Sequence, residues 1–137
     1  MTELHIRSGE KRQLVDITDQ VQRVVVESGV QRGLCYLFVP HTTAGLTLNE
    51  NWDPKVRGDI LSALERIVPS GPYKHQEGNS PAHIMASLIG SEATLFIEGG
   101  RLLLGSWQGV FLAEFDGPRS RRVLICVRDD EGAGEHI

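Results

Sequence analysis

The apolar residues of the chain recur with two different periods, and each period predicts one kind of element. Alternating or continuous apolar runs bounded by Gly, Pro, Asn or Asp predict strands, whereas apolar residues spaced three and four apart predict helices. Strands are expected over residues 4–8, 13–17, 34–39, 45–49, 93–98, 101–104, 107–115 and 121–128. Helices are expected over residues 18–28, 54–68 and 81–89.

Strands lie toward both ends of the sequence and helices lie between them, which predicts an α+β fold. We expect a single domain with about seven or eight mostly antiparallel strands, in two layers or one curled sheet, and three helices. The domain should span residues 1–128. Residues 129–137 are acidic and poor in apolar side chains, so they are expected to form a loose C-terminal tail.

Small polar residues and prolines mark the expected helix ends. Thr18 can cap the first helix, and Gly29 after it suits a left-handed C-terminal cap. Asp53 followed by a proline is typical of a second helix start, and Ser80 followed by a proline repeats the signal.

The penultimate strand is apolar on both of its faces. Trp107, Phe111 and Phe115 share one face, while Val110 and Leu112 share the other. Such a strand lies either inside a sandwich or at an interface with another subunit. We favour an interface, because one small core cannot easily cover this much apolar surface.

The charge balance is that of an ordinary soluble globular protein. The chain has 14 basic and 18 acidic residues and a formal charge of −4. Positive charge gathers at Arg119, Arg121, Arg122 and Arg128, but no aromatic platform accompanies it and acidic residues follow at once. A local anion site is therefore expected rather than a nucleic-acid interface.

Cys35 and Cys126 each lie within an apolar run, where a thiol packs as a small hydrophobic group. We predict that both are reduced and lie in the core. The sequence begins with no leader pattern and contains no apolar stretch of membrane-spanning length. A cytoplasmic protein that neither crosses nor binds a membrane is expected.

Three histidines lie where predicted strands or helices meet loops. His41 follows a buried strand, and His75 and His83 lie eight residues apart around a glycine-containing loop. On a helix over residues 81–89, His83 and Ser87 share the side opposite the apolar face. The helix N-terminus should keep the His83 imidazole neutral, the form that binds a metal or accepts a proton.

We predict that His41, His75 and His83 form one cluster that binds a divalent metal, zinc or magnesium. Three imidazole ligands with an open position suit catalytic zinc, and an added carboxylate, for which Glu77 is the nearest candidate, suits other divalent ions. The spacing matches no local zinc motif, so two alternatives stay open. His83 could be a solvated surface histidine, and His41 could be a strand-end histidine bonded to the backbone.

The expected catalytic residues are His41, Glu77 and His83. Arg119 and Arg121 follow a predicted turn and could bind phosphate or carboxylate, although a turn arginine is more often solvated. Further substrate contacts are expected from Thr42, Thr43, Asn79 and Ser87, whose hydroxyl and amide groups lie beside the three histidines.

Several separate motifs together resemble the YjbQ family, whose members are described as secondary thiamine-phosphate synthases. They are His41-Thr42-Thr43-Ala44-Gly45, Asn49-Glu50-Asn51 with Asp53-Pro54, Ala82-His83, Gly105-Ser106-Trp107-Gln108 and Glu114-Phe115-Asp116-Gly117-Pro118-Arg119. The resemblance covers residues from about 4 to 128 and no motif departs from it.

This resemblance implies a homotrimer with a metal-associated pocket at or near the subunit interface. It also implies an enzyme that joins a pyrimidine methyl diphosphate to a thiazole phosphate, either as its main activity or as a side activity. The same residues would serve a metal-dependent hydrolase of a phosphorylated metabolite. A non-catalytic module that binds a metal or a phosphorylated small ligand is the remaining alternative.

Overall fold

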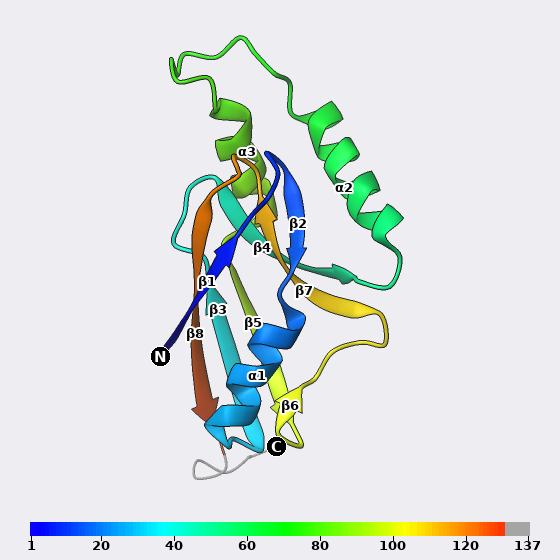
Figure 1. Ribbon diagram of the computed structural model, residues 1–137, viewed down its shortest axis with the longest axis vertical. Coiled ribbons are helices and arrows are strands. Elements are labelled where there is room, and N and C mark those ends of the chain that lie inside the picture. Colours follow the sequence, from blue (N-terminus) through cyan, green and yellow to red (C-terminus); the bar gives the residue numbers. More distant parts are fainter. Residues whose placement is uncertain (131–137) are drawn as a thin grey trace.

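The computed structural model describes residues 1–130, which form eight strands and three helices as the sequence predicts (Figure 1). Residues 131–137 lie outside the described residues. In chain order the elements are β1 (Thr2–Arg7), β2 (Gln13–Asp16), α1 (Thr18–Ser28), β3 (Arg32–Phe38), β4 (Ala44–Glu50), α2 (Pro54–Ile67), α3 (Ser80–Ile89), β5 (Glu92–Glu98), β6 (Arg101–Leu102), β7 (Gln108–Glu114) and β8 (Ser120–Asp129).

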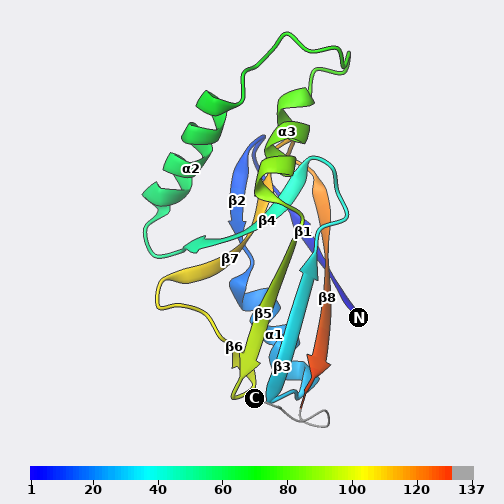
Figure 2. The same ribbon diagram turned by 180° about the vertical axis from the view of Figure 1, so that it is seen from behind.

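The strands form two antiparallel sheets, in agreement with the predicted two-layer α+β fold. The larger sheet has the order β1-β8-β3-β5-β6, and the smaller has the order β2-β7-β4. Helix α1 packs between the sheets against β6, β7 and β8, while α2 and α3 contact β2 and β4 of the smaller sheet. Figure 2 shows the opposite face of the larger sheet, which no helix covers.

Strand β7 separates two hydrophobic cores. Val110 and Leu112 pack with the larger sheet and α1, whereas Phe111 and Phe115 pack with α2 and α3. Both faces of β7 are therefore covered within one chain, and its middle residues are fully buried. The prediction of a subunit interface at this strand is wrong, because α2 and α3 cover its second face within the same chain. Of the apolar side chains named for this strand, Trp107, just before β7, is the one that stays exposed.

The uncovered face of the larger sheet carries exposed aromatic side chains between charged ones. Tyr36, Phe38 and Phe96 are exposed there. They alternate along β3 and β5 with buried residues such as Cys35 and Leu37, as the two faces of a strand require.

The helix ends follow the sequence signals except at the starts of α1 and α3; α3 begins at Ser80, and its cap position is Asn79, with no side-chain cap hydrogen bond. Gly29 ends α1 in the left-handed conformation, and the Asp53 side chain accepts a hydrogen bond from the backbone N–H of Lys55. Thr18 does not cap α1 with its side chain. Its hydroxyl and backbone N–H both donate to Asp16, and its oxygen accepts from the N–H of Val110, because β2 and β7 pass close to this end of the helix.

The last strand is longer than expected. Asp129 pairs with Gly33 in β3, and the N–H of Asp130 bonds to the carbonyl of Arg32, so the predicted tail begins inside the sheet. The rest of that prediction falls on residues 131–137. Both cysteines are free, with Cys35 buried and Cys126 half-buried. Within residues 1–130, no helix combines the length and the apolar character needed to span a membrane.

Candidate functional site

Two adjoining hollows lie where the loop after β3, the first turns of α3 and the turn between β7 and β8 meet. Their volumes are about 400 and 420 Å³, and both are lined by His41, Thr42 and His83. We call them together the histidine groove. Its remaining lining residues are Pro40, Thr43, Ala44, Glu77, Asn79, Ala86, Ser87, Gly90, Ser91, Asp116, Arg119 and Arg121.

A close backbone contact holds the two walls of the groove together. The N–H of Leu46 in β4 donates to the carbonyl of Gly90, the residue that ends α3, at 3.0 Å. A Cβ atom on Gly45 would lie 2.3 Å from that same carbonyl oxygen, which is closer than real Cβ atoms approach. Glycine at position 45 therefore lets the strand carrying one wall approach the helix carrying the other.

A buried ion pair fixes the floor beside the groove. Glu114 is fully buried, and both of its carboxylate oxygens accept hydrogen bonds from the Arg121 guanidinium. Ser8 donates its hydroxyl to Glu114 at 2.7 Å, and the Asp116 N–H donates at 3.0 Å. Arg121 also donates to the carbonyl and hydroxyl of Thr43. One carboxylate thus ties together β1, β7, β8 and the loop that carries His41.

Burial by itself would raise the pKa of Glu114, but the hydrogen bonds from Arg121, Asp116 and Ser8 lower it below its usual value. The ion pair is therefore charged at neutral pH. Sequence analysis predicts Thr43 and Arg121 as substrate contacts, and both line the groove. Their polar groups are bound to each other and to Glu114, however, so their role in this structure is to hold the wall.

His41 has a specific partner for one of its ring nitrogens. The backbone N–H of Arg122 donates to Nε2 of His41 at 2.9 Å. Burial lowers the pKa of His41, and the charges of Arg121 and Arg122 lower it further. An accepting Nε2 and a lowered pKa describe a neutral ring that carries its proton on Nδ1. This matches the alternative of a strand-end histidine bonded to the backbone.

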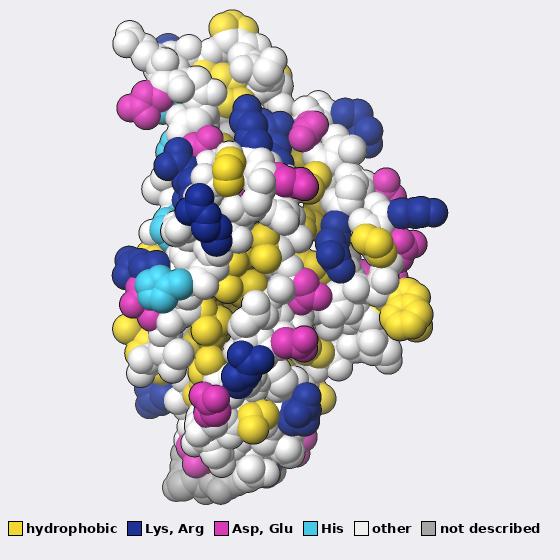
Figure 3. All heavy atoms as spheres, in the orientation of Figure 1, with side chains coloured by type: hydrophobic (Ala, Val, Ile, Leu, Met, Phe, Trp, Pro, Cys, Tyr) yellow, Lys and Arg dark blue, Asp and Glu magenta, His cyan; other side chains and the backbone are white. Residues whose placement is uncertain are grey.

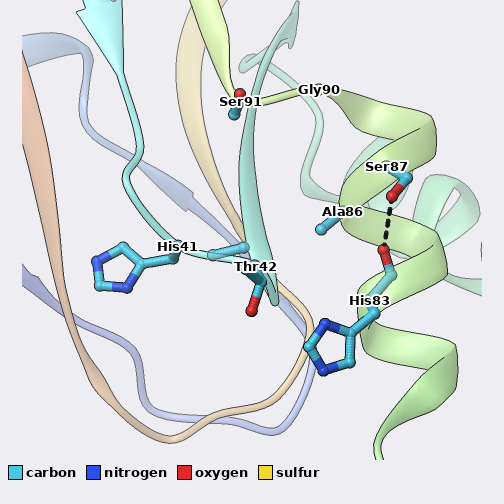
Figure 4. Close-up of a pocket in the computed structure, with 8 residues that line it drawn as sticks. His41, Thr42, His83, Ala86, Ser87, Gly90 and Ser91 are labelled. Atoms are coloured by element: carbon cyan, nitrogen blue, oxygen red, sulfur yellow. Dashed lines mark hydrogen bonds between the residues drawn. The ribbon is translucent and has the colours of Figure 1, made fainter.

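His75 and His83 lie together, as the short loop between them predicts. Their ring centroids are 5.6 Å apart in an edge-to-face arrangement. Nε2 of His75 lies 4.0 Å from a carboxylate oxygen of Glu77. Figure 4 shows Thr42 between the rings of His41 and His83, with the ring of His41 pointing away from α3.

The three histidines are therefore not one ligand set within a single chain. Among residues 1–130, no group of three or more His, Cys, Asp or Glu side chains is arranged to hold a metal ion. The physical reason at His41 is that its Nε2 lone pair is already bonded to the N–H of Arg122. The residues that one chain presents do not fit the predicted metal.

The remaining predicted contacts lie around the second hollow. Arg119 donates to the carbonyl and the carboxylate of Asp116, and its side chain is about half exposed. Asn79 donates from Nδ2 to the same carboxylate at 3.1 Å. Burial would raise the pKa of Asp116, but these bonds from Asn79 and Arg119 lower it. Ser87 donates its hydroxyl to the carbonyl of His83, one turn earlier in α3.

Sequence analysis includes Glu114 and Asp116 in one of the motifs but assigns neither a role in this site. A signal was present, because Glu114 is the only charged residue in the otherwise apolar β7 and Arg121 follows it seven residues later. A lone buried carboxylate in a central strand needs a charged partner. The strand pairing that brings Ser8 to the same carboxylate from 106 residues away is not visible in the sequence.

Comparison with known proteins gives one consistent family. The family model described as "UPF0047 protein YjbQ-like" matches residues 2–130. A UPF0047 protein of Methanocaldococcus jannaschii is 46% identical over 127 residues, which are 92% of each chain. The UPF0047 protein YugU of Bacillus subtilis is 40% identical and is matched over 94% of its length by 89% of this chain.

Solved structures agree with these sequence matches. A crystal structure of a YjbQ/UPF0047 family protein from Clostridium acetobutylicum superposes with a TM-score of 0.91 at 50% identity, covering 93% of this chain and all of the other. A conserved protein of Thermus thermophilus superposes with a TM-score of 0.87 at 43% identity, with the same coverage. The similarity therefore extends over the histidine groove and the rest of the fold.

Proposed function

The chain belongs to the UPF0047 family of YjbQ-like proteins, and from that premise we propose that it is an enzyme acting on a phosphorylated small molecule in the histidine groove. The observation that supports this most directly is the contact between His75 and His83, with Glu77 beside them and Arg119 across the second hollow. His83 and Glu77, which can transfer protons, and the Arg119 cation therefore line the same hollow, which is large enough for a small substrate.

Each imidazole has a distinct role in this proposal. His83 transfers a proton to or from the substrate, and His75 with Glu77 positions its ring. His41, held neutral with its proton on Nδ1, acts as a hydrogen-bond donor rather than a base. Arg119 is the anion contact, because its side chain is about half exposed, whereas the Arg121 side chain is buried against Glu114.

The reaction to test first is the one that the family resemblance implies. A thiazole nitrogen attacks the methylene carbon of a pyrimidine methyl diphosphate, a C–N bond forms, and the C–O bond to diphosphate breaks with its electron pair leaving on oxygen. No protein nucleophile is required. The groove needs only to align the two substrates and stabilise the departing charge through Arg119 and the imidazole N–H groups.

Of the predictions made from the sequence, the metal ion has the least support from the arrangement of side chains within one chain. His75 lies near both Glu77 and His83, but among the described residues of one chain no three such side chains are arranged to hold a metal ion. The proposed steps therefore involve neither zinc nor magnesium.

The test is turnover of the purified protein with both thiamine precursors and with a panel of phosphate esters. We expect turnover that falls at least about a hundredfold in His83→Ala, a typical loss for a general acid or base. His5→Ala is the matched control, since His5 is exposed on β1 and lines neither hollow. Ester cleavage without thiamine phosphate formation would favour the hydrolase, and tight phosphate binding without turnover would favour the non-catalytic module.

We further place the active protein in the cytoplasm and expect it to be a homotrimer. The free thiols of Cys35 and Cys126 support a reducing compartment. The exposed aromatic face of β3 and β5 supports assembly with further copies, in place of β7. Light scattering should give three chains per particle. Phe96→Asp should reduce that number, because it places a charge on the proposed interface. An unchanged number of chains in this variant would show that this face is not part of the interface.

A further inference from the structure

The other end of the smaller sheet carries a second, separate hollow. It has a volume of about 500 Å³ and is lined by Leu48, Asn49, Glu50, Gly105, Ser106, Trp107 and Gln108. We call it the tryptophan hollow. In the β4–β7 register, Ala44 pairs with Glu114 at the histidine groove and Glu50 pairs with Gln108 here. Six residues of strand separate the two sites by roughly 20 Å, so one small ligand cannot reach both within a chain.

An unsatisfied carboxylate is the first unusual feature of this hollow. Oε2 of Glu50 is buried and has no hydrogen-bond partner among the described residues. Buried polar atoms in folded proteins are almost always bonded, so an exception requires an explanation such as a missing ligand. The contrast with Glu114 is direct, because both oxygens of that carboxylate are fully bonded.

Two exposed tryptophans form the second feature. Trp107 is 56% exposed and Trp52 is 74% exposed, and their ring centroids lie 5.4 Å apart in an edge-to-face pair. Figure 3 shows hydrophobic side chains protruding at the side of the molecule where β4 leads into α2. Exposed aromatic rings next to a carboxylate can stack a flat ring and attract a positive charge on it.

The backbone beneath the tryptophans is firmly held. Asn51 donates its N–H to the carbonyl of Trp107 at 2.9 Å, and its own carbonyl accepts from Arg57. A turn hydrogen bond joins the N–H of Gln108 to the carbonyl of Gly105, and the Gln108 side chain accepts from the N–H of Gly105. The tryptophan hollow is therefore a preformed surface rather than a loose loop.

We propose that the tryptophan hollow binds a flat aromatic ring bearing an amidinium or protonated amino group, with its N–H groups donated to Glu50 and its ring stacked on Trp107. The unpaired oxygen supplies the acceptor that such a donor needs, and the indole supplies both the stacking surface and a negative π face. A neutral ring of the same shape would gain the stacking but lose the charge-assisted bond. A second copy of this chain covering the tryptophans is the competing occupant.

The probe is benzamidinium, and its neutral isostere benzamide is the matched ligand control. The chain contains two tryptophans, both in this pair, so ¹⁵N-labelled protein should show two indole N–H signals that report directly on the hollow. We expect benzamidinium to shift the Trp107 signal in a saturable manner. Benzamide should bind at least about tenfold more weakly, since it lacks the charged hydrogen bonds.

Variants separate the carboxylate from general surface charge. Glu50→Gln and Trp107→Ala should each weaken benzamidinium binding at least about tenfold. Glu92→Gln, which removes an exposed carboxylate from β5, should leave binding unchanged. Equal binding of benzamide, or full binding by Glu50→Gln, would overturn the proposal. Indole signals that are insensitive to both ligands and protected from solvent would overturn it in favour of a second copy of the chain.

Discussion

The two ends of the three-stranded sheet place a glutamate in opposite situations. At the end near the histidine groove, Glu114 is fully buried and every carboxylate oxygen is bonded to Arg121, Ser8 or Asp116. At the other end, Glu50 has a buried oxygen with no partner. The first arrangement is complete within the chain and holds the fold together, whereas the second lacks a donor that a ligand can supply.

Replacing the two glutamates is the strongest way to test this contrast. Glu114→Ala should lower the free energy of unfolding by about 3–5 kcal/mol, because it leaves the buried Arg121 without its counter-charge. Glu50→Ala should change it by about 1 kcal/mol or less, since no hydrogen bond of that carboxylate oxygen is lost. Urea denaturation followed by circular dichroism measures both.

Glu114→Gln provides a second comparison if the alanine variant does not fold. It keeps the size of the side chain and removes the charge, so it should still be less stable than Glu50→Gln. Equal losses at positions 114 and 50 would mean that the two ends of the sheet do not differ in the way the hydrogen bonds indicate.

The contact between the walls of the histidine groove should give a smaller effect. Gly45→Ala places a Cβ atom against the Gly90 carbonyl and should cost about 1–3 kcal/mol as the strand and helix move apart. Gly58→Ala is the matched control, because a Cβ atom there meets nothing within 4 Å and the residue lies inside α2. It should stabilise the protein by about 0.5–1 kcal/mol. A neutral Gly45→Ala would show that the walls are not held by this approach.

The dependence of stability on pH should show the smallest difference. The pKa of His41 in the folded chain is below its ordinary value. As the pH falls, this histidine therefore binds a proton in the unfolded chain before it does so in the folded chain, and stability falls below about pH 6.5. The folded pKa of Glu114 is also lowered, so its contribution is present above about 4.5 and is lost at lower pH. Two separate losses are expected on acidification.

His41→Gln should remove only the loss that starts near pH 6.5, because the amide can still accept from the Arg122 N–H but does not titrate. The loss below pH 4.5 should persist in this variant. Denaturant midpoints measured from pH 8 to pH 3 provide the test. A variant whose profile matches the wild type across the upper range would show that His41 is not held neutral.

The sequence predicted the elements well and the pairing of polar groups poorly. The apolar runs of β3, β7 and β8 and the cap signals at Gly29 and Asp53 depend on neighbouring residues, so local pattern was enough. The closeness of His75 and His83 also follows from a short loop. The expected metal cluster required His41 to face His75 and His83. Instead, Nε2 of His41 accepts a hydrogen bond from the backbone N–H of Arg122, which is remote in the sequence.

Sequence alone therefore determined the α+β class, the strands, the helices and the position of the histidine groove at the strand and helix ends. Only the tertiary structure decided which polar groups are already satisfied. Glu114 and Ser8 are 106 residues apart in the chain, and His41 and Arg122 are 81 apart, yet both pairs are hydrogen-bonded. Hydrophobic period is a local property, whereas a hydrogen bond depends on atomic distances set by the register of strands that are remote in the sequence.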